Sequence, residues 1–554
     1  MRSLVTTRRN LLKVLAAVGG VAALADLGAA AQRRRASEAA TPPRTTAYHW
    51  RDPAAGSLAA QGALAERTYT SAVYRAPSAF NAVGSRWPGR IGLLEIRASA
   101  DGSAWTPWHV VTTHEHDTMG PGRDGRAFGD LLTGSGWRYV QYRLAVPAGL
   151  PPADVELVLI DSGDGSQVAG PLASESLGTL GATQPPIVSR AGWGCDESYR
   201  FDSSGAEIWP REYRVVQKGI VHHTATSNDY TDAAAVVRAI YYYHAVTLEW
   251  GDIGYNYLVD RWGNVYEGRA GGANVVGGHA LQYNYGSTGI ACIGTYGPGG
   301  AYPAAWPPAA VKDALARIVA WTCRYLDPHG QAYFIDKVYP SLVGHRDVLP
   351  TTCPGDNLYA YLPALRDTVQ AIIGPTVPTP AAQVSRVAFI PTSLPPGSAL
   401  RVEVTVANTG SGTMITQGPG PGYTYPEGQS FKAAGYAEIP GAFRIAVDFD
   451  GNATGVDHPY RWGLPDALEP GRSTTVVGYV QLSTLQRRSY WAGLVQEGVR
   501  WWVTQTGTAA VKVLPAYCFP SATPAATALE SPPATLADLP NRIYFPLASR
   551  SVCE

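Results

Sequence analysis

The chain has 554 residues, with 44 Lys and Arg against 44 Asp and Glu, so its formal net charge is zero. This balance gives no strong attraction to nucleic acid, and we expect no nucleic-acid partner. At about 150 residues per domain the length predicts three or four domains. With 60 Gly, 43 Pro and only 16% charged residues, the composition favours short strands and many turns over long surface helices.

Residues 1–31 are predicted to be an export signal. Arg8 and Arg9 precede a weakly apolar run over residues 14–27, and residues 29–31 offer small side chains for cleavage. A paired arginine before a mild apolar core resembles a twin-arginine signal. The alternative is a membrane anchor, which the short Ala/Gly-rich run disfavours because a spanning helix needs about 20 apolar residues. We therefore expect a secreted or cell-envelope protein with no integral membrane segment after cleavage.

The next part of the chain is predicted to be a β-sandwich. Residues 32–45 are polar and basic and are interpreted as a tether. Over residues 46–165, short apolar runs with period two alternate with turn-rich segments, which is typical of a sandwich. Its Trp105, Trp108 and Trp137 either fill the core or face a glycan, because a flat ring can stack on a sugar. Residues 166–186 are a Gly/Ser/Pro-rich linker.

Residues 187–373 have a different pattern, in which strands and helices alternate. Apolar runs that end at His222 and that cover residues 255–260 and 287–294 predict strands. Helical periodicity covers residues 231–244, 308–326 and 358–373, with Thr231 as a candidate N-cap of the first helix. We expect an α/β domain, a mixed β-sheet covered by helices.

The remainder of the chain returns to an all-β pattern. Residues 374–385 form a Pro/Thr-rich linker. Over residues 386–515, apolar and polar side chains alternate with period two, as in residues 400–406. This predicts an immunoglobulin-like β-sandwich. Residues 516–554 form a low-complexity segment and a C-terminal tail.

The chain has six cysteines, and an exported protein can keep disulfides. If Cys353 binds a metal, the remaining five leave one unpaired. Cys518 with Cys553 would tie down the tail, and Cys292 with Cys323 would tie a strand to a helix. Cys195 has no evident partner, and the spacing leaves the pairing open.

Three residues in turn-rich contexts have the chemistry of a zinc site. His222 ends an apolar strand, and His345 and Cys353 lie eight residues apart in a Gly/Pro/Thr-rich segment. Two imidazoles and one thiolate are donors that a catalytic Zn2+ takes, with a fourth position open for water. The alternative for His222 is a hydrogen-bonded surface histidine. The three together predict a zinc site.

Seven segments in order resemble the peptidoglycan recognition protein family, which shares its fold with the zinc-dependent N-acetylmuramoyl-L-alanine amidases of amidase type 2. The resemblance covers about residues 185–372. Any one segment would be weak, but seven in the same order form a specific signal. The segments are residues 189–194, 221–225, 250–257, 266–269, 278–280, 284–290 and 344–355.

The resemblance implies a zinc hydrolase that cleaves the amide bond between N-acetylmuramic acid and L-Ala in peptidoglycan. It implies His222, His345 and Cys353 as metal ligands and Tyr255 as the residue that serves the attacking water or the oxyanion. Members that only bind peptidoglycan have lost one or more ligands, whereas all three are present here. The alternatives are a non-catalytic peptidoglycan-binding protein and a cell-surface anchoring protein.

The sequence departs from related branches at two positions. Thr351, the second residue expected to act in catalysis, stands where phage amidases carry a lysine. Ala291 stands where the cytoplasmic amidases carry a glutamate base, so the general base is not identified.

The resemblance also implies substrate contacts. Arg269 and His279 match positions that line the family's groove, and Trp250 and His223 are further candidates. The expected partner is peptidoglycan, both stem peptide and glycan, bound by a monomer. The sequence does not distinguish lysine from diaminopimelate stems, own-wall remodelling from attack on other cells, or the ligands of the two sandwiches.

Overall fold

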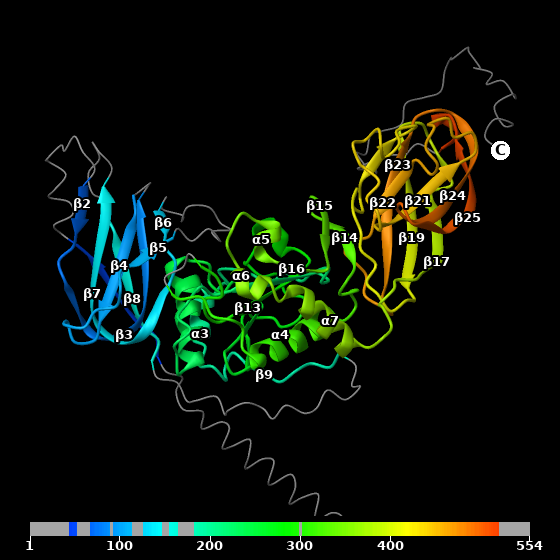
Figure 1. Cartoon of the computed structure of the whole chain (residues 1–554). Coiled ribbons are helices and arrows are strands. Elements are labelled where there is room, and N and C mark those ends of the chain that lie inside the picture. The colour runs from blue at the N-terminus through cyan, green and yellow to red at the C-terminus, as the bar shows by residue number, and fades with distance from the viewer. Residues whose placement is uncertain are drawn as a thin grey trace, which may run out of the picture.

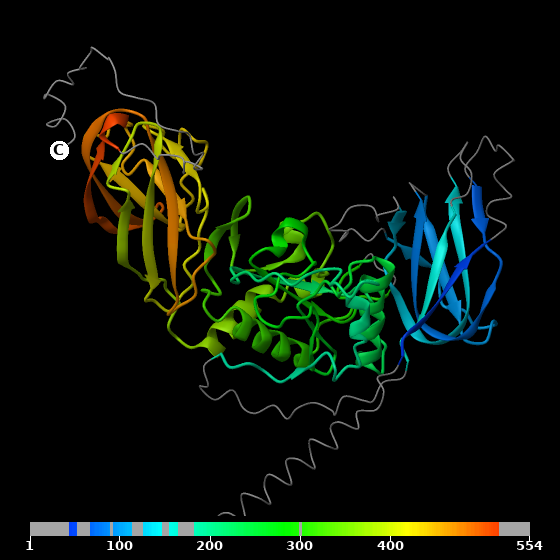
Figure 2. The same ribbon diagram turned by 180° about the vertical axis from the view of Figure 1, so that it is seen from behind.

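Three units follow one another along the chain in the computed structural model. Figures 1 and 2 show from both sides a central unit of strands and helices between an N-terminal and a C-terminal unit of strands. The predicted signal and most of the tail lie outside the described residues. Among the residues that are described, no helix is both long and apolar enough to span a bilayer. The structure describes residues 44–52, 67–88, 92–112, 126–146, 154–163, 182–298 and 302–519.

The N-terminal unit is an antiparallel sheet, eight-stranded over its described residues. The strands follow the order β1-β8-β3-β7-β4-β5, with β2 added beside β7 and β6 beside β3. The 15-residue strand β3 changes partner along one edge: it pairs with β7 between Tyr74 and Val83 and with β6 from Arg86. Its other edge pairs with β8 from Ala82. The strands are β1 (Thr46–Arg51), β2 (Arg67–Thr70), β3 (Tyr74–Pro88), β4 (Leu94–Ser99), β5 (His109–Val111), β6 (Arg126–Phe128), β7 (Leu132–Val146) and β8 (Glu156–Asp161).

The three tryptophans of this unit that the sequence singled out have different surroundings. Trp137 is buried in the core with Phe80. Trp105 and Trp108 are partly exposed, and the Arg97 guanidinium lies 4.5 Å from each of their ring centroids. Of these three, Trp137 alone fills the core, where Trp87 is buried as well. The assignment of the unit as a β-sandwich stays a prediction.

The central unit has the predicted mixed α/β arrangement. Its sheet follows the order β16-β10-β13-β11-β12-β9, in which β16, β10, β13 and β11 are mutually parallel and β12 is antiparallel to β11. A separate hairpin joins β14 and β15. Its strands are β9 (Ile187–Val188), β10 (Lys218–His223), β11 (Tyr257–Val259), β12 (Val265–Glu267), β13 (Ser287–Cys292), β14 (Gln331–Phe334), β15 (Lys337–Pro340) and β16 (Leu342–Gly344).

Helices cover both faces of this sheet. The helix α3 packs on the face that carries Leu258 and Ala291, whereas α4 and α7 pack on the face that carries Val221 and Ile290. Because successive strand side chains alternate, His222 points to the α3 face. The helical segments are η2 (Glu197–Arg200), α3 (Ala233–Tyr242), η3 (Tyr243–Thr247), η4 (Leu281–Asn284), α4 (Ala309–Thr322), α5 (His345–Val348), α6 (Asp356–Tyr359) and α7 (Leu362–Ile373).

The N-cap of α3 lies one residue later than the sequence predicts. Asp232, and not Thr231, is the N-cap, and its carboxylate accepts a hydrogen bond from the Ala235 amide at 3.0 Å. Residues 233–241 of the helix are all buried. A helix that is apolar all round needs a second covering layer.

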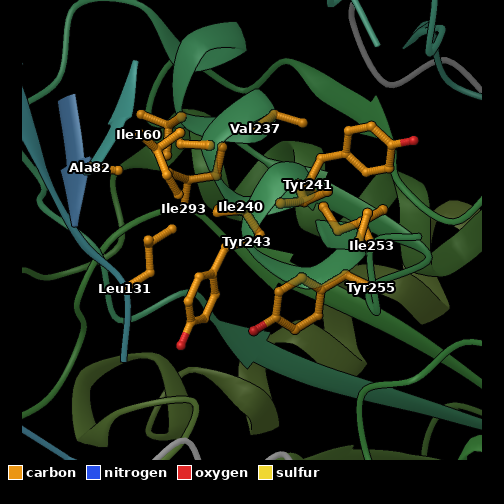
Figure 3. Close-up of a cluster of buried hydrophobic side chains, with 14 of the residues drawn as sticks. Ala82, Leu131, Ile160, Val237, Ile240, Tyr241, Tyr243, Ile253, Tyr255 and Ile293 are labelled. Carbon is orange, nitrogen blue, oxygen red and sulfur yellow. The ribbon is translucent and has the colours of Figure 1, made fainter. Parts of the chain in front are cut away.

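The N-terminal unit supplies that second layer. Leu131 and Ile160 from its strands and loops belong to one apolar core with Val237 and Ile240 of α3, as Figure 3 shows. The buried Arg238 side chain adds polar contacts, donating to the carbonyl oxygens of Ser162 and Gly163 at 2.8 Å each. The N-terminal and central units therefore share an apolar core.

The C-terminal unit consists of two sheets. One follows the order β17-β19-β23-β20 and the other β18-β25-β24-β21-β22, and both contribute to one apolar core. The strand β17 begins at Ala382, inside the predicted linker. The immunoglobulin-like assignment stays a prediction. The segments are β17 (Ala382–Ile390), β18 (Ser393–Leu394), β19 (Ser398–Asn408), β20 (Thr424–Pro426), β21 (Phe443–Phe449), β22 (Tyr460–Gly463), β23 (Ser473–Leu482), β24 (Gln486–Gln496), β25 (Arg500–Val513) and η5 (Ala516–Cys518).

The cysteines do not pair as one candidate scheme suggested. Cys292 and Cys323 are both free and buried, as are Cys195 and Cys353, so the strand-to-helix disulfide is wrong. Cys518 is disulfide-bonded. Its expected partner in the tail lies outside the described residues.

Candidate metal centre

The three predicted metal ligands converge at one end of the parallel strands. His222 is on β10, and its neighbour β16 ends at Gly344, which places His345 next to His222 at the start of α5. Cys353 follows in the next loop. One potential ligand atom from each residue lies within 4.8 Å of the others, and all three residues are buried. The centroids of the two imidazole rings are 4.4 Å apart.

Hydrogen bonds fix the loop that carries two of these ligands. The Asp347 carboxylate accepts from the Gly344 amide at 2.8 Å and from the Tyr359 hydroxyl at 2.6 Å, which holds the first turn of α5. The Thr351 hydroxyl accepts from the Cys353 amide at 3.1 Å. The structure thus gives Thr351 a positioning role for the Cys353 backbone, and its predicted part in catalysis stays a prediction.

The surroundings of His222 assign a role to each of its ring nitrogens. Nδ1 lies 3.7 Å from the Cys353 sulfur, and Nε2 lies 3.0 Å from Nδ1 of His279. Burial lowers the pKa of His279 to about 3, so its ring is neutral and can accept. If Nδ1 of His222 binds a metal, Nε2 carries the proton and donates it in a hydrogen bond to His279. A metal-ligating histidine almost always has such a partner.

The Cys353 thiol fits a bound cation. Burial raises its pKa to about 12, although the His223 backbone amide at 3.4 Å favours the thiolate. A buried thiolate is costly without a compensating charge, and a coordinated Zn2+ deprotonates a thiol outright. A thiolate and two neutral imidazoles are a zinc-binding set. The residues present therefore fit this ion.

Tyr255 lies next to His222. Their ring centroids are 5.5 Å apart, and the His244 ring is 5.7 Å from Tyr255 on the other side. Burial, assisted by the negative charges of Cys353 and Asp130, raises the pKa of Tyr255 above its ordinary value near 10. The phenol therefore keeps its proton at neutral pH and can donate a hydrogen bond.

The four predicted substrate residues do not form an exposed surface. Arg269, His279, Trp250 and His223 are each at most 8% exposed. Arg269 forms an ion pair with Asp252 at 2.9 Å, and His223 accepts from the Tyr296 amide at 3.3 Å.

The structure therefore shows a structural contact for each of these side chains. His279 supports the ring of His222, and the Trp250 ring packs 4.9 Å from that of His244. The predicted contacts with substrate stay predictions.

One contact and one residue near the site carried no signal in the sequence. The partnership of His279 with His222 depends on a ring-to-ring contact between distant segments. Asp130 belongs to the N-terminal unit, yet its charge acts on Tyr255 and Cys353. Nothing in the local sequence of residue 130 distinguishes it from other loop aspartates.

Comparison with known proteins identifies the class of this fold and site. Residues 212–356 match the family model described as N-acetylmuramoyl-L-alanine amidase. Peptidoglycan-recognition protein SC2 of Drosophila simulans is 35% identical over 182 residues, which cover 32% of this chain and 84% of that protein. Its counterpart in Drosophila melanogaster is 39% identical over the same shares. The chain belongs to the peptidoglycan-recognition protein family.

More distant matches add less. The N-acetylmuramoyl-L-alanine amidase of Homo sapiens is 31% identical over 226 residues, but this covers only 39% of this chain and 35% of that protein. Among solved structures, wild-type Drosophila PGRP-LB is 29% identical and covers 32% of this chain and 92% of its own, with a TM-score of 0.25. We draw no structural conclusion from a score this low.

Proposed function

We propose that this protein is an exported zinc hydrolase that cleaves the amide bond between N-acetylmuramic acid and L-Ala in peptidoglycan. The observation that carries the proposal is the convergence of His222, His345 and Cys353 within 4.8 Å. The family match supports the same reaction, because its model is described as an amidase.

Each residue of the site has a role in this reaction. His222 through Nδ1, His345 and Cys353 would hold Zn2+, which supplies an acidified water and polarises the scissile carbonyl. Tyr255 donates a hydrogen bond towards the carbonyl oxygen, on which negative charge develops during attack. Because its pKa is raised, Tyr255 enters the reaction as a neutral donor.

His279 and Thr351 act through the ligands. By accepting from Nε2 of His222, His279 fixes the tautomer that leaves Nδ1 for the metal. Thr351 holds the backbone amide of Cys353. Ala291 pairs with His222 across the sheet and offers no proton acceptor. Proton transfer therefore depends on Tyr255 and the groups next to it rather than on residue 291.

Ala291 favours a second candidate, a protein that binds peptidoglycan without cleaving it. Both candidates place the protein outside the cytoplasm as a monomer, with the two flanking units as β-sandwiches that hold the central unit at the wall. They differ in whether new amino termini are formed.

The test combines metal analysis with a chemical assay. Purified protein should hold one zinc per chain and should release new L-Ala amino termini from purified cell walls. The Cys353→Ser variant should lose both zinc and release. Mass spectrometry of the products identifies the bond and the stem type together. A protein without zinc, or one with zinc and no release, refutes the amidase proposal and leaves binding.

A further inference from the structure

One turn of the N-terminal unit is fastened to the central unit at both of its ends. It covers residues 129–133, from the end of β6 into the first residues of β7. At its start, the Tyr243 hydroxyl donates to the Gly129 carbonyl oxygen. At its end, the Thr133 amide donates to the Tyr302 hydroxyl at 2.6 Å, and the Ser227 amide donates to the Thr133 hydroxyl at 3.0 Å. The turn is therefore held in one place relative to the central unit.

Both fastening points are on segments that adjoin residues of the candidate metal centre. Tyr243 adjoins His244, whose ring packs against Tyr255. Figure 3 shows the hydroxyl groups of Tyr243 and Tyr255 pointing to the same side. Ser227 lies on the segment that leaves β10 after His222 and His223. The turn is thereby tied to the segments that carry Tyr255 and His222 into the site.

Asp130 is the charged residue of this turn. Its backbone amide donates to the Thr112 carbonyl oxygen at 2.9 Å, which fixes its position within the N-terminal unit. The residue is partly exposed, so its carboxylate can contact a ligand. Its two neighbours in the chain both contact the surroundings of the site. Gly129 accepts from the Tyr243 hydroxyl, and Leu131 belongs to the same apolar core as Tyr255 and Ala291.

We propose that Asp130 is a substrate-binding residue, which the N-terminal unit contributes to the site and which accepts a hydrogen bond from an N–H donor of the stem peptide. An ionised carboxylate is an acceptor only, so it selects amide N–H or ammonium groups and repels stem carboxylates. This inference rests on the proposed function. It makes the N-terminal unit part of the substrate site as well as a structural cover for α3.

The primary test is steady-state kinetics of the full-length zinc protein on a soluble N-acetylmuramoyl peptide. Asp130→Asn keeps the shape but removes the charge, and we expect a KM raised about tenfold with kcat within twofold, because a ground-state contact to a charged group is lost. Asp130→Glu should recover part of the loss. Asp154→Asn, at an exposed carboxylate of the same unit, should leave KM unchanged.

A second variant tests the placement of the turn. Tyr243→Phe keeps the ring but removes the donor to Gly129, and it should raise KM about threefold, less than Asp130→Asn, because the other end of the turn stays fastened. Zinc content should stay at one per chain in the Asp130, Asp154 and Tyr243 variants. An unchanged KM in Asp130→Asn, or a loss confined to kcat, would overturn the inference.

Calorimetry separates this inference from the proposed reaction. In the Cys353→Ser background, which does not cleave, adding Asp130→Asn should weaken binding of the same peptide about tenfold. This difference would support the substrate contact even if the wild-type protein released no amino termini. Equal peptide affinity of Cys353→Ser and of the Cys353→Ser, Asp130→Asn double variant would overturn the inference. Failure of both proteins to bind the peptide would overturn it as well.

Discussion

Replacing His279 by Ala should weaken zinc binding without touching a metal ligand. The change removes the acceptor that lies 3.0 Å from Nε2 of His222 and leaves that N–H buried without its partner. Loss of such an outer partner typically lowers metal affinity 10- to 100-fold. This corresponds to about 1.4 to 2.8 kcal/mol. The cost of an unsatisfied buried donor, about 1–3 kcal/mol, gives the same range.

The assay is competition for zinc with a chromogenic chelator at neutral pH. His279→Gln offers an amide oxygen to Nε2 of His222 and should recover most of the affinity. His329→Gln, at a half-exposed histidine that pairs with Asp367, is the matched control and should bind zinc as the wild type does. An unchanged zinc affinity in His279→Ala would refute the view that His279 orients the ligand.

Three further predictions concern other parts of the molecule. Tyr255→Phe should lower kcat about 10²- to 10³-fold while zinc content and wall binding persist, because one hydrogen-bond donor to a developing oxyanion is lost. Tyr213→Phe, at an exposed tyrosine, is the control and should leave kcat unchanged. A full rate in Tyr255→Phe would contradict the role of Tyr255. Asp252→Asn breaks a buried cluster in which Asp252 pairs with three arginines. It should lower the free energy of unfolding by about 3–5 kcal/mol, measured by denaturant unfolding. Asp367→Asn, at an exposed carboxylate, is the control and should cause no measurable change. For Glu156, burial opposes ionisation, but hydrogen bonds led by those from His49 and Arg86 outweigh it and lower the pKa to about 2. The contribution of ionised Glu156 to stability is therefore complete above about pH 4.5 and is lost as the pH falls towards 2. Glu156→Gln should flatten the pH dependence of the melting temperature between these two values. A melting temperature that varies with pH as steeply as in the wild type would contradict this.

The convergence of the three candidate metal ligands was predictable because each carries its own local signal. His222 ends an apolar strand, and His345 and Cys353 stand in one turn-rich segment. Donor chemistry then singled out zinc before any fold was known. The substrate residues were less predictable, because the sequence shows residue type but not burial. Arg269 was expected to pair with a carboxylate of the stem peptide, yet in the structure its guanidinium pairs with the buried Asp252.

The disulfide scheme fails for a related reason. Cys292 lies on β13 and Cys323 directly after α4, and both side chains belong to the same apolar core. Sharing a core does not bring two sulfur atoms to bonding distance, and both residues are free. Pairing depends on the direction of each Cβ, which the sequence does not contain.

The sequence by itself predicted the alternation of strands and helices and the donor set of the candidate metal centre, and the family resemblance added Tyr255. The first two depend on side-chain period and residue chemistry, which are local properties. Tertiary structure alone decided that β16 lies beside β10, that His279 contacts His222, and that the turn containing Asp130 is fastened near the site. The physical reason is that these contacts join segments far apart in the chain, which only the packing of sheets and helices brings together.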